Sequence, residues 1–215
     1  MTRPLFTLFL VLLTAALPHR AADPRYNVRR ILAADGQPWG TVYSVLQDSR
    51  GYIWFGTSGG LDRFDGYGYR SYRYDAFNPN GLSGMRVTCL AEDSTGAIWA
   101  GTYAGGLNRL DRRTDRFTRF AHDASDSTTI SGDMIRALAT DARGFVWIAT
   151  TEGLDRYDPR TGRCTRFSIG IPTSLQVDRS GRMWVCAVRE TQGAIILRHD
   201  PRTDSFAEWI VESGT

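Results

Sequence analysis

The sequence predicts an all-β protein made of four-stranded antiparallel units in tandem. One pattern, D-x-x-G-x-[apolar]-W, occurs four times, and each copy lies between short runs rich in β-branched and aromatic residues. The residues of the pattern are Asp48, Gly51 and Trp54; Asp93, Gly96 and Trp99; Asp141, Gly144 and Trp147; and Asp178, Gly181 and Trp184. One copy would be a weak signal, whereas four copies in series indicate a structural repeat.

Each unit offers four candidate strands in the same order. The first precedes the Asp, the second carries the Trp, the third has the form L-x-R-x-D or a close variant, and the fourth is a short aromatic run. The Asp-x-x-Gly segment predicts a hairpin turn, because the Asp side chain can accept backbone hydrogen bonds and the Gly tolerates a positive φ. The units are expected at about residues 42–73, 87–120, 135–167 and 172–210.

The spacing of the repeat favours β-propeller blades. Trp54, Trp99, Trp147 and Trp184 are separated by 45, 48 and 37 positions, and the differences fall in the connections rather than in the strands. Four antiparallel strands in a repeat of this length are typical of a propeller blade. We therefore predict four blades that belong to a larger propeller of about seven.

The repeated residues are expected to serve packing. A Trp at the same place in every unit predicts a wedge between neighbouring blades, with ligand stacking as the alternative. The turn Asp is assigned to its hairpin rather than to a cation. The Arg and Asp of the third strand point to one face, which favours an ion pair within the blade or a bond to the turn over a row of recognition arginines.

The three cysteines are expected to be structural thiols. Cys89 and Cys186 occupy slots that small residues hold in the other units, so both are predicted to be small buried fillers. Cys164 stands in a slot that aromatic residues hold in the other three units, namely Tyr69, Phe117 and Phe206.

Composition and the first residues bear on location and partners. The 215-residue chain has a formal net charge of +3, and its basic residues, all Arg, are scattered along the chain, which argues against nucleic-acid binding. Residues 1–22 resemble a signal peptide, because the apolar run from Leu5 to Leu17 follows Arg3 and is too short for a membrane span. We expect residues 23–215 to be exported, in the periplasm or otherwise outside the cytoplasmic membrane; an uncleaved anchor is the alternative.

Residues 26–32 are expected to form a strand like the last strand of a blade. The fourth unit already has a last strand of its own, so this strand has no evident partner for closing a ring. We therefore expect a partial propeller that belongs to a longer protein.

The repeat resembles a known family, the two-component regulator propeller. Residues 48–65 and 93–111 meet that family's pattern D-x-x-G-x-[IL]-W-[IF]-G-T followed by G-G-L-[DN]-R-[YF]-D, and residues 80–84 and 129–132 are similar to its connections between blades. The resemblance extends over residues 26–210, although the fourth unit departs from it at Cys186-Ala187. It implies the periplasmic sensor region of a hybrid histidine kinase or diguanylate cyclase, which detects glycans or other small molecules and whose output domain lies elsewhere in a longer chain.

We accordingly predict a non-catalytic ligand-sensing module. The site is expected at the mouth formed by loops 57–60, 102–106, 150–153 and 187–193, where the polar or aromatic side chains are those of Tyr103, Glu152, Arg189 and Glu190. A protein-interaction platform and a propeller lyase or lactonase are the alternatives. The sequence contains no catalytic motif, so no enzyme activity, cofactor or metal is expected. A small molecule or glycan and signalling output domains are the expected partners, with the membrane reached only through the N-terminal signal or through segments beyond this sequence.

Overall fold

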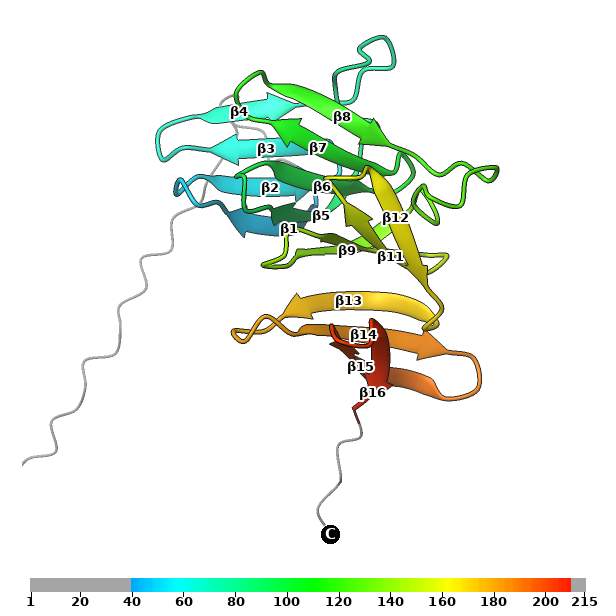
Figure 1. Cartoon of the computed structure of the whole chain (residues 1–215). Coiled ribbons are helices and arrows are strands. Elements are labelled where there is room, and N and C mark those ends of the chain that lie inside the picture. Colours follow the sequence, from blue (N-terminus) through cyan, green and yellow to red (C-terminus); the bar gives the residue numbers. More distant parts are fainter. Residues whose placement is uncertain (1–39, 210–215) are drawn as a thin grey trace, which may run out of the picture. The chain divides into compact units, whose positions relative to one another are not determined.

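The computed structural model describes residues 40–209. The predicted signal peptide and the predicted strand at 26–32 lie outside these residues. The described residues form sixteen strands and no helix (Figure 1). No helix that could cross a membrane occurs in this part of the chain.

The strands form four antiparallel sheets of four, and in each sheet the strands follow the order of the chain. Unit 1 contains β1 (Val42–Gln47), β2 (Ile53–Thr57), β3 (Gly60–Phe64) and β4 (Tyr69–Tyr72). Unit 2 contains β5 (Val87–Glu92), β6 (Ile98–Thr102), β7 (Leu107–Asp111) and β8 (Arg116–Phe120). Unit 3 contains β9 (Ile135–Thr140), β10 (Val146–Thr150), β11 (Leu154–Asp158) and β12 (Arg163–Phe167). Unit 4 contains β13 (Ile171–Val177), β14 (Met183–Arg189), β15 (Gly193–Asp200) and β16 (Ser205–Glu208).

The prediction of four four-stranded antiparallel units is confirmed. Each Asp-x-x-Gly segment forms a hairpin in which the Gly N–H donates to the Asp carbonyl, at 2.9 Å in the first unit. The four turn glycines have φ between 78° and 87°. Glycine adopts this conformation readily, whereas a residue with a Cβ is strained in it. The repeated Gly therefore follows from the backbone of the turn.

A β-bulge recurs near the start of the first strand in every unit. The register shifts by one residue there, which leaves a single residue of the first strand unpaired against the second strand. The bulged residues are Tyr43, Thr88, Arg136 and Thr173. A bulge redirects the side chain that it carries, and bulges are frequent beside functional sites.

Apolar clusters join each unit to the next. Trp54, Trp99 and Trp147 are fully buried, and each belongs to a cluster that contains residues of the following unit. Burial of a ring of this size stabilises by several kcal/mol on the usual area scale, so these contacts hold the units together. Trp184 differs, since it is only half-buried and packs edge-to-face on Trp209 of its own unit, with ring centroids 5.2 Å apart.

Candidate functional site

The two ends of the strands use their polar side chains differently. We call the end with the Asp-x-x-Gly hairpins the turn end, and the opposite end, with the β2–β3-type loops, the loop end. In unit 1, Asp48 Oδ1 accepts the N–H groups of Arg50 and Tyr52, both at 2.9 Å, while Oδ2 accepts the indole N–H of Trp54 at 2.7 Å. The turn Asp accepts the indole N–H in the other units too, at 2.8, 3.0 and 2.9 Å. Sequence analysis assigned the Asp and the Trp separate roles and missed this bond, although their constant spacing of six residues was a visible signal.

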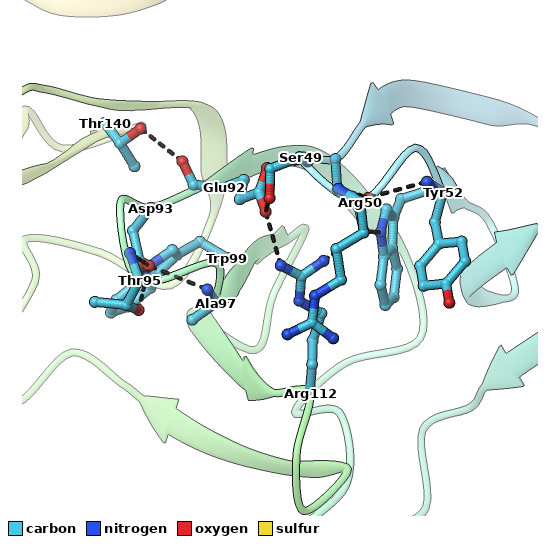
Figure 2. A network of polar contacts seen from close by, with 12 residues as sticks. Ser49, Arg50, Tyr52, Glu92, Asp93, Thr95, Ala97, Trp99, Arg112 and Thr140 are labelled. Atoms are coloured by element: carbon cyan, nitrogen blue, oxygen red, sulfur yellow. Dashed lines mark hydrogen bonds and ion pairs between the residues drawn. The ribbon is translucent and has the colours of Figure 1, made fainter. Parts of the chain in front are cut away.

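At the turn end, a buried cluster of charged side chains joins units 1 and 2 (Figure 2). The Arg112 side chain is only 5% exposed; its Nη1 donates to Asp48 Oδ2 at 2.5 Å and its Nη2 to Glu92 Oε1 at 2.7 Å. The Glu92 carboxylate also accepts the N–H and the hydroxyl of Ser49, both at 2.7 Å. Charge-assisted bonds of this kind link the hairpin of unit 1 to unit 2, so these charges serve the fold.

The third strands place each Arg directly opposite the Trp of the same sheet. The guanidinium of Arg109 lies over the ring of Trp99 at 5.8 Å and also faces the turn residue Asp93 at 3.7 Å. Arg156 and Arg198 likewise lie over the Trp of their own units. The expected bond to the turn therefore exists in unit 2, but the recurring contact is a cation–π contact with the Trp.

The second residue of the L-x-R-x-D pattern is buried and fixes the connections between units. Asn108 Oδ1 accepts the N–H of Ser83 at 2.9 Å, and Asp155 Oδ2 accepts that of Ser131 at 2.6 Å. A Cβ at Gly105 would lie 2.5 Å from the Ser83 carbonyl oxygen, so only Gly fits where the two loops approach. The backbone that leads into β5 is thereby held in place.

The loop end of units 1 and 2 brings together an arginine and two tyrosines. Arg86, just before β5, accepts the N–H of Tyr103 through its carbonyl at 3.0 Å. Its guanidinium carbon lies 4.5 Å from the ring centroid of Tyr103 and 5.6 Å from that of Tyr43, the bulged residue of β1. The tyrosines are 44% and 46% exposed, and Arg86 has no carboxylate partner among residues 40–209. We call these three residues the Tyr–Arg–Tyr group.

The other predicted site residues lie elsewhere. Glu152 is exposed, and it lines a cleft of about 360 Å³ together with the connection at residues 168–171. Arg189 is on β14, where its Nε donates to the carbonyl of Ile169 at 3.3 Å and its Nη1 pairs with Glu208. Glu190 stands in an exposed turn.

The structure therefore does not gather the four predicted residues into one site. Tyr103 joins Tyr43 and Arg86, whereas Glu152 and Arg189 flank the connection between units 3 and 4. Sequence analysis missed Tyr43 and Arg86. The sequence signal for these two residues was weak, because both lie outside the β2–β3-type loops in which the site was expected. Tyr43 is distinguished only as the one aromatic residue among the four bulged positions, and Arg86 directly precedes a strand.

The described residues include no group of three or more His, Cys, Asp or Glu side chains placed to hold a metal ion. His122 Nδ1 lies 2.8 Å from the carbonyl oxygen of Ile130, and His199 Nε2 lies 2.9 Å from Asp204. Both imidazoles thus have partners in the fold.

The cysteines differ in exposure. Cys89 is buried and Cys164 is half-buried, and burial raises the pKa of each thiol to about 12. Cys186 is exposed, so the prediction of a buried filler was wrong there. In units 1 and 2 this slot is glycine and lies against the first strand of the next unit. Unit 4 is followed by no further unit among residues 40–209, and Cys186 is exposed there.

Comparison with known proteins agrees with the repeat. The family model described as "Two component regulator propeller" matches residues 36–59 and 81–104. No curated protein matches the chain in sequence.

The solved structures that are similar in fold include the following three. The extracellular domain of a hybrid two component system from B. thetaiotaomicron is 19% identical with a TM-score of 0.68, over 81% of this chain and 25% of that chain. Virginiamycin B lyase from Staphylococcus aureus is 14% identical with a TM-score of 0.64, over 85% of this chain and 59% of that chain. An auxiliary nutrient binding protein from Bacteroides thetaiotaomicron is 16% identical with a TM-score of 0.59, over 80% and 42%.

This chain therefore spans about a quarter of the first of these proteins and less than two thirds of the other two. At such identities the likeness shows the fold alone. Taken with the matched repeats, the predicted resemblance is confirmed at residues 36–59 and 81–104, which match the two-component regulator propeller repeat. The described residues as a whole form four four-stranded antiparallel units.

Proposed function

We propose that this chain is a non-catalytic, ligand-sensing propeller module of a bacterial two-component or cyclic-dinucleotide signalling receptor, and that it works outside the cytoplasmic membrane. The matched repeat supports the signalling context, and the fold is shared with an extracellular domain of a two component system. The signal-peptide pattern of residues 1–22 supports export. The output partner in this proposal is a histidine kinase or diguanylate cyclase in a longer chain.

The Tyr–Arg–Tyr group carries the proposal of a ligand site. The Arg86 guanidinium lies against two aromatic rings, and it forms no ion pair with a carboxylate of the described residues. A guanidinium binds a carboxylate through two parallel hydrogen bonds, and exposed tyrosine rings bind the apolar face of a sugar. The ligand class that fits is an acidic glycan, a sugar that bears a carboxylate.

A binding experiment with two matched sugars tests this site. We expect trigalacturonate to raise the melting temperature of the chain and neutral cellotriose to have little effect, since only the first offers carboxylates to Arg86. R86A should weaken binding of trigalacturonate by at least about tenfold in calorimetry, a loss of about 1.4 kcal/mol. R113A, which removes an exposed arginine from the β7–β8 turn, is the matched control and should bind as the wild type does.

Two results would contradict the site in different ways. Equal binding by R86A and the wild type would place the sugar elsewhere on the chain. No binding of either sugar would favour the second candidate, a protein-interaction platform. The specific observation behind that candidate is Met85, which is 62% exposed beside Arg86, because exposed apolar side chains next to aromatic ones are typical of protein interfaces.

A further inference from the structure

Aromatic rings fill the contact between units 3 and 4. Trp147 and Phe167 of unit 3 meet His199 and Phe206 of unit 4, and the centroids of these rings lie 4.9 to 6.1 Å apart. Phe206 comes from the last strand, β16. Its ring lies edge-to-face with Phe167 at 5.4 Å.

The contact between units 1 and 2 repeats this arrangement on its outer side. Phe117, from the last strand of unit 2, is 5% exposed and lies edge-to-face with Tyr72 at 5.5 Å. Phe117 and Phe206 therefore hold the same position, each against the last strand of the preceding unit. In both cases an aromatic ring completes the contact.

The contact between units 2 and 3 lacks that ring. Trp99, Phe120 and Tyr157 correspond to Trp147, Phe167 and His199, with centroids 5.0 to 5.6 Å apart. The position of Phe117 and Phe206 is held by Cys164, which pairs with Tyr157 across the sheet. One aromatic side chain is thus replaced by a thiol.

A pocket of about 250 Å³ lies at this position. Its walls include Cys164, Phe120, Tyr157 and Ile130, and Thr128 and Thr129 add hydroxyl groups. A cavity of about 150 Å³ is enough to hold a benzene molecule. The pocket therefore has room for one aromatic ring.

The backbone around the pocket matches the filled contact. The N–H of Cys164 donates to the carbonyl of Thr128 at 2.8 Å, and that of Phe117 donates to the carbonyl of Asn80 at 2.8 Å. The connecting segment thus approaches the last strand in the same way in units 2 and 3. The space arises from the change of side chain and not from a displaced loop.

We propose that this pocket binds a small monocyclic aromatic molecule, or a terminal aromatic ring of a larger one, in the place that Phe117 and Phe206 take in the neighbouring units. Phe120 and Tyr157 supply edge-to-face partners for the ring. A neutral thiol is a soft, polarizable wall against an aromatic edge. Polar substituents would point toward Thr128 and Thr129. This site is separate from the Tyr–Arg–Tyr group and does not depend on it.

Phenol is the probe for the test, because it combines a benzene ring with one hydroxyl group. We expect phenol to raise the melting temperature of the full chain and to shift the amide signals of Thr129 and Gly162 in ¹H–¹⁵N spectra. C164F should place a ring in the pocket, raise the melting temperature without phenol, and weaken phenol binding by at least about tenfold. C164A should keep the pocket and bind phenol as well as the wild type or better.

The control is C186A, which removes the exposed thiol of unit 4 and should leave phenol binding unchanged. If C164F does not fold, C164L fills the same space with an apolar side chain that has no ring, and it too should weaken binding. Phenol bound equally by the wild type and the filled variant would overturn the proposal. So would a wild-type chain in which phenol shifts neither the melting temperature nor these amide signals.

Discussion

The turn end and the loop end of units 1 and 2 each present an arginine, and the two are used in opposite ways. At the turn end, Arg112 is buried between Asp48 and Glu92, whose oxygens also accept bonds from the hairpin of unit 1. At the loop end, Arg86 is exposed, lies against two tyrosine rings and has no carboxylate partner in residues 40–209. The charged side chains at the turn end bind one another within the fold. The Arg86 guanidinium at the loop end has no such partner among the described residues, and it is the group that we propose binds the ligand.

R112A should give the largest effect on stability. It leaves Asp48 and Glu92 without their cation in a buried setting, and removal of one partner from a buried ion pair costs about 3–5 kcal/mol. Urea unfolding followed by tryptophan fluorescence measures the free energy of unfolding. The neighbouring R113A should stay within about 0.5 kcal/mol of the wild type, because Arg113 is exposed. Equal effects of the two substitutions would show that the ion cluster contributes no more than a surface charge.

The second prediction compares a buried and a half-buried copy of the same tryptophan. W99F removes the indole bond to Asp93 and part of a fully buried ring, which should cost about 2–3 kcal/mol. W184F removes the same bond to Asp178 from a half-buried position and should cost less than about 1 kcal/mol. Urea unfolding followed by far-UV circular dichroism gives both values without relying on the altered fluorophore. Equal costs would mean that the next unit adds nothing to the burial of Trp99.

How far the sequence predicts this molecule depends on the range of the contacts. The hairpins and strands follow from local patterns, and each sheet contains the four strands in chain order that its unit was expected to have. The burial of Trp184 and Cys186 could not be predicted from the sequence of their own unit. In the other units, residues of the next unit bury the corresponding positions. The same holds for the candidate site, since Tyr43 and Arg86 belong to different units and meet only because a bulge and a fixed connection bring them together.

Cys164 is an intermediate case. Alignment of the four units shows that a thiol replaces an aromatic residue, but it does not show whether the neighbouring connection moves in to close the gap. That depends on the hydrogen bond from Cys164 to Thr128, which holds the connection where its counterpart lies in unit 2. A pocket is therefore a property of the assembled units.

A smaller effect, with a defined pH dependence, is expected at Asp155. Burial raises the pKa of this carboxyl, against the opposing hydrogen bonds from Ser131. The folded state then holds its proton more tightly than the unfolded chain, so stability falls as the pH rises from about 3.9, the unfolded value, through the raised folded pKa. D155N removes this dependence and introduces the residue that unit 2 has at Asn108. At pH 7 it should equal the wild type or exceed it by up to about 1 kcal/mol, and at pH 3.5 the gain should shrink.

Asp93, at the turn end, supplies the control of opposite sign. Burial alone would raise its pKa, but hydrogen bonds from Thr95, Trp99 and two backbone N–H groups outweigh burial and lower the pKa. Its contribution is therefore present above about pH 3.9 and is lost as the pH falls through the lower folded value. D93N should be destabilised at pH 7, and its deficit should narrow below pH 4. Parallel pH profiles for D93N and D155N would contradict the assignment of the two carboxyls.

The smallest effect on stability is expected for R86A. Arg86 is exposed and its described side-chain contacts are two cation–π contacts, which contribute about 0.5–1 kcal/mol at exposed sites before the entropy of ordering three side chains is subtracted. We expect a change within about 0.5 kcal/mol in urea unfolding, far below that of R112A. The same R86A variant should also be measured for binding of the acidic sugar. A large loss of binding with little loss of stability would assign Arg86 to the ligand rather than to the fold. A loss of stability in R86A as large as that in R112A would remove the distinction between the two ends, and the loop-end arginine would then be a structural residue like its counterpart.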